Sequence, residues 1–293
     1  MSYSQGGLIS ASDFNGIANG TTGANIAWVW GTGYGTTGYG QSTSALASLA
    51  SGATVSAAQW SGMLGVLNNC LGHQHSSTYQ LGPLNYTAGQ TITYFANVLT
   101  AATGINVSGN ISAYSATGAG VTASFSANPS VGAGAAYNNA DVVTRTVTFA
   151  SAAQARYFFN AGGSIKFSCY TTTSSTSNAE TTSVVGMVNA LGNLTINNSV
   201  YTTLSTALAT KVGNDAGSGA YTADYSNVRV ATNSVNSSGA GDYGYIITIK
   251  LGINTTAHSS FNSGWNITIP HSIVVTPPET TYLSNVWGVF GQT

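Results

Sequence analysis

Residues 245–253 read YIITIKLGI, and this stretch decides the fold class. Every second side chain from Tyr245 to Ile253 is apolar, whereas Thr248 and Lys250 lie between them. Successive side chains of an extended chain point to opposite faces, so this period of two gives one apolar and one polar face. The stretch therefore predicts a strand that is half buried.

The same alternation recurs in short stretches after Gly104, separated by clusters of Gly, Asn and Ser. Short strands with turn residues between them are typical of an antiparallel sandwich or jelly-roll-like body. We expect two helices within this body, one at 152–160 capped by Ser151 and one at about 182–191. The stretches are INVSGNISAY (105–114), GVTASFSA (120–127), VVTRTVTFA (142–150), SIKFSCY (164–170), NVRVAT (227–232), WNITIP (265–270) and SIVVT (272–276).

Helical signals dominate the first third of the chain. Ser10 or Ser12 can cap a short helix, and Thr54 or Ser56 can begin a longer one whose apolar stripe has spacings of three and four. We expect Gly72 to end that helix and a further helix at about 90–103. The predicted fold is thus mainly β with some α.

The predicted domain boundary lies in a loop at 76–89, which contains the breaker pair Gly-Pro. We expect a helical region for attachment and assembly at 1–85 and a β-rich body at 86–293.

Charged residues are scarce: the chain has six Lys and Arg and seven Asp and Glu among 293 residues. Asp13 is the sole charged residue before Asp141. An ordinary domain draws about a quarter of its residues from these four types. Here Ser, Thr, Asn, Gln and Gly replace them, which favours a neutral surface that packs against copies of itself. Six cations are too few for a nucleic-acid-binding face, and no stretch approaches the ~18 apolar residues of a membrane helix.

The opening MSYSQGGLIS lacks the basic and apolar parts of a signal peptide. We therefore expect synthesis in the cytoplasm, with Cys70 and Cys169 as buried reduced thiols.

His73-Gln74-His75 is the sharpest local signal. In an extended segment both imidazoles would face one side, and three chains around an axis would supply six nitrogen ligands, a set suited to iron or zinc. Alternatively, the rings cap carbonyls at the end of the preceding helix, where partial negative charge favours donors. We favour capping, and we expect no cofactor unless a symmetric oligomer shares the histidines.

Trp28, Trp30, Tyr34 and Tyr39 lie together in a glycine-rich stretch. Aromatic rings stack on sugars in glycan-binding sites, and they also occupy the centres of subunit interfaces. The chain has 16 tyrosines, which favours the interface. Trp265 is a further candidate of the same kind.

Asp141, Arg145, Arg156 and Lys166 fall within 26 residues of an otherwise almost uncharged chain. We expect structural ion pairs that lock two strands and the intervening helix together, within one subunit or between subunits. An active site is the weaker interpretation, because no nucleophile and base accompany these charges. The carboxylates form no close pair in the sequence, so a glycosidase would need the fold to bring two together. We expect no enzyme activity.

Several of these stretches are familiar in combination. GLISASDFNGI (7–17), WVWGTGYGTTGYGQ (28–41) and SAAQWSGMLGVLNN, followed by GHQH (56–75), together resemble the N-terminal part of structural proteins of tailed bacteriophages, especially cyanobacterial and marine phages. VTFASAAQARYFFNAGGSIKFS (147–168) resembles a segment that recurs in virion and tail-associated proteins of the same phages. The HQH tripeptide also resembles the HxH iron sites of phage tail-fibre tips, which sit on intertwined trimeric shafts.

The resemblance covers about a third of the chain and implies a virion protein of the tail, baseplate or fibre, trimeric or hexameric, without catalytic residues. We therefore expect a tail-apparatus component whose partners are its own copies and other virion proteins, located in the virion. We also expect the N-terminal half to be covered by neighbouring subunits. The alternatives are a head decoration or neck protein, and a glycan-binding adhesin or depolymerase with a host surface glycan as partner.

Overall fold

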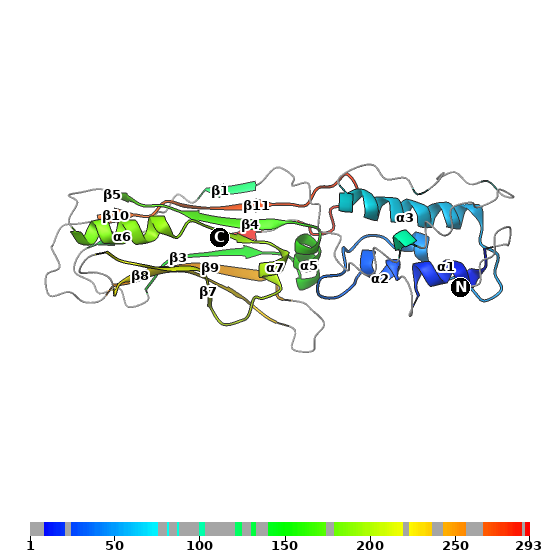
Figure 1. Cartoon of the computed structure of the whole chain (residues 1–293), viewed down its shortest axis with the longest axis horizontal. Helices are drawn as coiled ribbons and strands as arrows, with labels where there is room; N and C mark the ends of the chain where they lie inside the picture. The colour runs from blue at the N-terminus through cyan, green and yellow to red at the C-terminus, as the bar shows by residue number, and fades with distance from the viewer. Residues whose placement is uncertain are drawn as a thin grey trace.

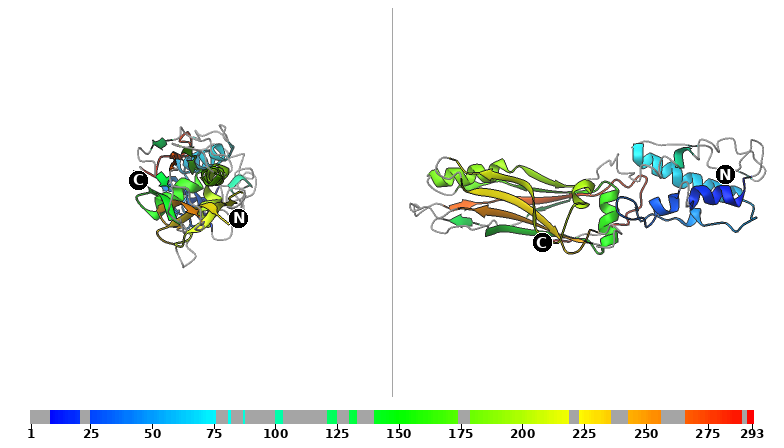
Figure 2. Two further views of the ribbon diagram at one scale, coloured as in Figure 1. Left: turned by 90° about the vertical axis from the view of Figure 1, so that its left-hand side faces the viewer. Right: turned by 60° about the horizontal axis from the view of Figure 1, so that its bottom comes forward.

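The chain is elongated, with its first helices at one end and its sheets at the other (Figure 1). The right-hand view of Figure 2 shows the same arrangement from another direction, and the left-hand view looks along the long axis. The computed structural model describes residues 9–20, 25–75, 81, 87, 100–102, 121–124, 130–132, 140–173, 179–218, 223–235, 243–255, 266–288 and 291–293.

Serine caps begin two helices of the helical end. Ser10 forms a capping box with Asp13, and the Ser56 hydroxyl accepts from the backbone N–H of Gln59 at 3.2 Å, so both predicted caps are confirmed. Asp13, the sole charged residue of the first 140, is only 3 % exposed, and one of its carboxylate oxygens serves this cap. The helices here are α1 (Ala11–Ala18), α2 (Ile26–Trp30), η1 (Ser44–Leu46) and α3 (Ala57–His75).

Gly72 does not end α3, which continues to His75, so this prediction is wrong. A Cβ at Gly72 would lie 2.6 Å from the Tyr282 ring, which is too close. Glycine is needed at this position because an aromatic ring packs closely against it. The helix continues past it without a turn.

Antiparallel pairing joins all the described strands in three sheets. The largest has the order β12-β3-β9-β8-β7, the second β1-β11-β4-β6 and the smallest β2-β10-β5. The strands are β1 (Val121–Ser124), β2 (Ser130–Gly132), β3 (Ala140–Thr148), β4 (Ser164–Cys169), β5 (Thr172–Thr173), β6 (Asn193–Ile196), β7 (Ala209–Ala216), β8 (Tyr225–Thr232), β9 (Ile246–Asn254), β10 (Asn266–Thr268), β11 (His271–Thr276) and β12 (Gly291–Gln292).

The alternation that predicted β9 is confirmed. Ile247, Ile249, Leu251 and Ile253 are all fully buried, whereas the side chain of Lys250 is partly exposed. They belong to one hydrophobic core that also contains side chains of β3, β4, β8 and β11.

Three helices accompany the sheets: α5 (Ala152–Asn160), α6 (Ala179–Ala190) and α7 (Asn198–Tyr201). The α5 prediction is confirmed at both ends, with Ser151 accepting from the backbone N–H of Gln154. Helix α6 begins three residues earlier than expected and packs on β7, β8 and β10. The predicted strand at 105–114 and most of the predicted helix at 90–103 lie outside the described residues.

An arginine and a histidine connect the two larger sheets. Arg145 on β3 donates from Nε to Nε2 of His271 on β11, at 2.8 Å. Because Nε2 accepts, the ring proton lies on Nδ1, which donates to the Ile269 carbonyl at 3.1 Å. Burial lowers the pKa of His271 from its ordinary 6.5; the Ile269 bond opposes this, and Arg145 adds to it.

We predict that this bridge makes the fold acid-sensitive. A lowered folded pKa gives a contribution to stability that is complete above about pH 6.5 and is lost as the pH falls through the folded value. His271→Gln keeps an acceptor for Arg145 but does not titrate. The free energy of unfolding, measured in denaturant at pH 7 and pH 5, should therefore fall less in H271Q than in the wild type. Equal losses in both proteins would contradict this assignment.

Candidate functional site

A glycine-rich loop at residues 31–41 meets helix α5 where the helical end joins the sheets (Figures 1 and 2). The loop follows α2 directly and precedes η1. Its peptide groups approach buried parts of the protein, where each carbonyl needs a donor. Helix α5 supplies these donors from its last two turns.

Asn160 holds the loop through its side-chain amide. Its Nδ2 lies 3.1, 3.0 and 3.1 Å from the carbonyl oxygens of Gly35, Thr37 and Gly38, so its two hydrogens are shared among three acceptors. Its Oδ1 accepts from Nδ2 of Asn198 at 2.6 Å. Asn160 is fully buried, and the bonds to it fix the loop relative to α5 and α7.

Arg156 ties down the first part of the loop. Its Nη2 donates to the Thr32 carbonyl at 2.7 Å, and its guanidinium carbon lies 5.3 Å from the centre of the Tyr157 ring. The Tyr157 ring also packs against Gly40, whose φ is +67° and whose Cβ, if present, would lie 2.4 Å from that ring. Glycine is required at position 40 for both reasons.

The C-terminal segment at residues 277–288 closes the other side of the junction. The Gln41 amide donates to the Ser284 carbonyl at 3.0 Å and accepts from the Ser284 N–H at 2.7 Å. This pair of bonds joins positions 243 residues apart in the chain. The helical end and the sheets are therefore connected by buried polar contacts as well as by the core.

His73 lies in the last turn of α3 and is fully buried. Its Nδ1 is 4.0 Å from Oε2 of Glu279, and neither ring nitrogen has a hydrogen-bond partner. The absence of a partner contradicts the expected capping role of this ring. Burial lowers the pKa of His73, while Glu279 and the Ala161 backbone act in the opposite direction.

The HQH motif is helical rather than extended. Residues two apart on a helix differ by about 200° around its axis, so His73 and His75 do not share a face as an extended segment would require. The His75 side chain lies outside the described residues. In the part of the chain that the structure describes, His, Cys, Asp and Glu form no group of three that could hold a metal ion. The shared-metal hypothesis stays a prediction.

The four clustered aromatic residues separate into two pairs. Trp30 and Tyr39 are buried and stacked at 6.0 Å, so they are core residues and not the expected contact candidates. Trp28 and Tyr34 are 37 % and 55 % exposed, with ring centres 4.6 Å apart in an edge-to-face arrangement. The sequence placed both tryptophans in a loop, whereas they lie on α2. Trp265 lies outside the described residues.

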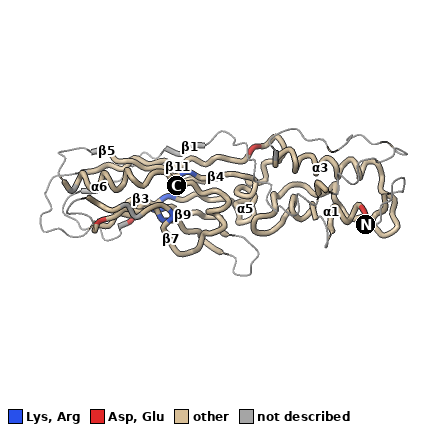
Figure 3. Tube along the Cα trace, viewed as in Figure 1, with Lys and Arg blue, Asp and Glu red and all other residues tan. Residues whose placement is uncertain are grey.

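Three of the four clustered charges bind separate partners outside the cluster. Asp141 pairs with Arg229 and, at 2.7 Å, with Lys250, which are 88 and 109 residues away in the chain. Arg145 binds His271 and Arg156 binds Thr32, as described above. Lys166 is exposed on β4. Figure 3 shows the charges along the chain, with blue segments grouped at the sheets.

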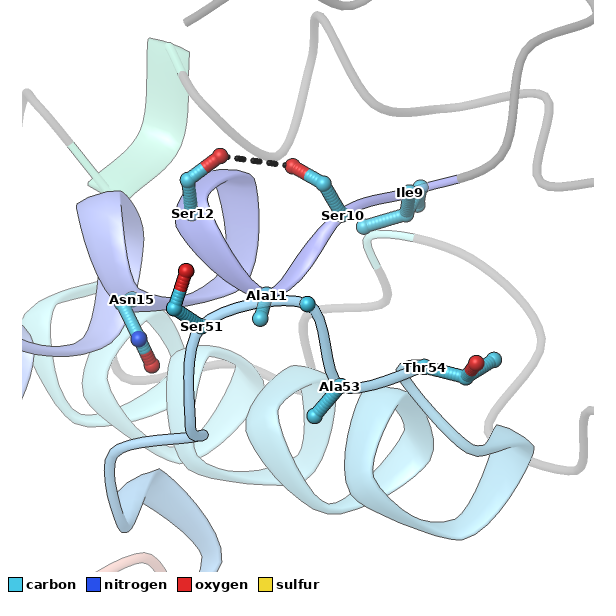
Figure 4. Close-up of a pocket in the computed structure, with 9 residues that line it drawn as sticks. Ile9, Ser10, Ala11, Ser12, Asn15, Ser51, Ala53 and Thr54 are labelled. Atoms are coloured by element: carbon cyan, nitrogen blue, oxygen red, sulfur yellow. Dashed lines mark hydrogen bonds between the residues drawn. The ribbon is translucent and has the colours of Figure 1, made fainter.

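A hydroxyl-rich pocket lies beside the start of α1 (Figure 4). Its volume is about 420 Å³, and the Ser10 and Ser12 hydroxyls are hydrogen-bonded at 2.7 Å within it. Its lining has no charged side chain and no aromatic ring that could stack on a ligand. The lining residues are Ile9, Ser10, Ala11, Ser12, Asn15, Ser51, Gly52, Ala53 and Thr54.

None of the protein-family models, curated proteins or solved structures compared with this chain matches it. The resemblance to phage structural proteins stays a prediction. Among the described residues, no helix combines the length and the apolar character needed to cross a bilayer.

We predict that Asn160→Ala destabilises the protein by about 3 kcal/mol, because it removes a fully buried side chain that donates to three carbonyls. Asn189 is the matched control, since its Oδ1 accepts two bonds from Thr171 at an exposed position. N189A should stay within about 1 kcal/mol of the wild type. Both are measured by denaturant unfolding, and equal effects in the two variants would contradict the anchoring role of Asn160.

We predict that His73→Leu is neutral or stabilises the protein by about 1 kcal/mol at pH 7, because it removes a buried polar ring whose nitrogens make no hydrogen bond and whose nearest carboxylate oxygen is 4.0 Å away. Its lowered pKa has the same sign as that of His271, so H73L should also lose less stability between pH 7 and pH 5. Destabilisation by more than about 2 kcal/mol would instead indicate a bound partner. Metal analysis of the assembled protein decides that case: about one iron or zinc per three chains is required.

Proposed function

We propose that this protein is a structural component of the tail apparatus of a tailed bacteriophage and acts as a homo-oligomer, a trimer or hexamer, within the virion. In this proposal the helical end attaches to the particle and the β-rich end is displayed. The observation that carries it is the elongated chain, whose two unlike ends are tied together by the buried contacts of Asn160, Arg156 and Gln41.

A rigid connection suits a part that transmits force or position between an attachment point and an exposed end. A flexible linker between the two ends would let each move independently. Here α5 and the segment at 277–288 both contact the helical end, so the chain crosses the junction more than once. This arrangement supports a structural role.

The distribution of charge supports burial of the helical end in an assembly. Asp13, the sole charged residue of the first 140, caps a helix and is 3 % exposed. The described ion pairs of Asp141 lie among the sheets. Neutral faces associate through hydroxyl, amide and apolar contacts, which salt screens little.

A sandwich or jelly-roll-like arrangement of the two larger sheets is part of the same proposal. Their buried faces contribute to one core, and the bond between Arg145 and His271 joins them. Such closed β bodies protect most strand edges and suit a displayed domain.

The alternative functions also assign one role to the helical end and another to the β-rich end. A head decoration or neck protein would also self-assemble, so only the position in the particle distinguishes it. An adhesin would use the exposed pair of Trp28 and Tyr34. A depolymerase would shorten host polysaccharide; we propose no catalytic role for this chain.

We predict a homo-oligomer whose mass is the same at 50 mM and 1 M NaCl, because charge pairs contribute little to neutral interfaces. Size-exclusion chromatography with light scattering on the full chain measures this mass. A monomer at both salt concentrations, or an oligomer that dissociates in 1 M NaCl, would contradict the proposal.

The position in the particle is tested by imaging. A label directed against the full chain should appear on the tail of phage particles that encode it. Label on the head or neck would show that the protein belongs there and not to the tail. If the particles carry no label, the protein is not a virion component.

A further inference from the structure

Trp28 and Tyr34 form an exposed aromatic corner. Their ring centres are 4.6 Å apart and their planes meet at 81°, which leaves a ring face beside a ring edge. The rings are 37 % and 55 % exposed. Neither side chain belongs to the core, in contrast to the neighbouring Trp30 and Tyr39.

The backbone beneath both rings is held rigidly. The Tyr34 N–H donates to the Thr37 hydroxyl at 2.9 Å, and that hydroxyl donates to the Tyr34 carbonyl at 2.8 Å. On α2, the Trp28 N–H donates to the side chain of Asn25 at 3.0 Å. The Gly38 N–H donates to the Val29 carbonyl at 3.0 Å, which joins the loop to α2.

The buried anchors of the loop flank Tyr34 on both sides. Arg156 binds the carbonyl two residues before it, and Asn160 binds the carbonyls of Gly35, Thr37 and Gly38 after it. Two side chains of α5 thus fix a short loop that presents an exposed ring. Preorganisation of this kind reduces the entropy lost when a ligand binds.

The size of the corner favours a small ligand. An aromatic side chain contributes about 150–250 Å² of surface, so these exposed fractions leave roughly 200 Å². A stable protein interface needs about 800 Å² on each partner. The corner is therefore close to the size of one or two sugar rings and too small to hold a second subunit alone.

The chemistry of the corner favours a neutral ligand. The guanidinium of Arg156, which binds the loop that carries Tyr34, is buried and engaged with Thr32 and Tyr157. A nucleobase would also stack, but its phosphates need a cationic groove. The C–H face of a pyranose stacks on an aromatic ring without any charge, and the Tyr34 hydroxyl and the Trp28 indole N–H can bond to its hydroxyls.

We propose that Trp28 and Tyr34 form a binding site for a neutral saccharide, with one pyranose ring stacked in the aromatic corner. Asn160 and Arg156 are positioning residues that hold the loop. The site goes beyond the structural role and does not rest on it, because a single chain contains both rings. It lies on the helical end, in the part that α5 contacts, so the proposal requires that this face stays uncovered when the chain assembles.

The test uses the full chain and a panel of neutral methyl glycosides: glucose, galactose, mannose, rhamnose and N-acetylglucosamine. Saturation-transfer NMR detects the bound sugar, and its titration gives the affinity in the wild type and in each variant. We expect at least one glycoside to bind in the millimolar range and its affinity to fall about tenfold in W28A and in Y34A. Tyr170→Ala is the matched control, because Tyr170 is 56 % exposed and lies directly after β4; its affinity should equal that of the wild type.

Three results would overturn the proposal. They are the absence of binding by every glycoside, an equal loss of affinity in Y170A, and binding of tetramethylammonium alone, which would indicate a cation site. Light scattering on W28A and Y34A separates this site from the proposed assembly. If the oligomer dissociates in these variants, the corner is a subunit contact and the saccharide site is wrong, while the structural function stands.

Discussion

Buried carbonyl groups need donors, and this constraint governs the junction on which the rest of the structure depends. The loop at 31–41 brings several carbonyls against α5, where one amide, that of Asn160, serves three of them. Removing that amide would take the Asn160 donor from all three carbonyls, and the bond to Gly38 is fully buried. The amide of Asn160 and the guanidinium of Arg156, both on α5, therefore help to hold the helical end against the sheets.

Close packing reinforces these hydrogen bonds at two glycines. Gly40 contacts the ring of Tyr157 and Gly72 contacts the ring of Tyr282, each at a distance that leaves no room for a Cβ. One ring comes from α5 and the other from the segment at 277–288. Because the loop and α3 each meet a different part of the chain, the junction resists rotation as well as separation. His73 lies in the same region, and neither of its ring nitrogens has a hydrogen-bond partner.

Features set by neighbours in the sequence were predictable, and features set by distant residues were not. The caps at Ser10, Ser56 and Ser151 and the buried face of β9 follow from local spacing. Nothing near Asp141 indicates that it pairs with Arg229, because 88 residues separate them. Local sequence suggests a helix end at Gly72. The actual reason for this glycine is its contact with the Tyr282 ring, which lies on a remote segment. The predicted stretches do not include β2, β5, β6, β7 or β12, and β7 has irregular pairing that obscures the period of two.

The aromatic cluster shows the same limit within the candidate site. Trp28 and Trp30 differ by two positions, yet the α2 helix exposes the first and buries the second. Composition explains why the exposed rings matter in this protein. Ser, Thr, Asn and Gln stand in for most charged residues of this chain, and water binds their hydroxyls and amides as well as a partner does. The few described charges are largely engaged in a cap, an inter-sheet bond or ion pairs. A rigid, uncharged aromatic corner is then one of the few places where the surface can gain binding energy that salt does not weaken.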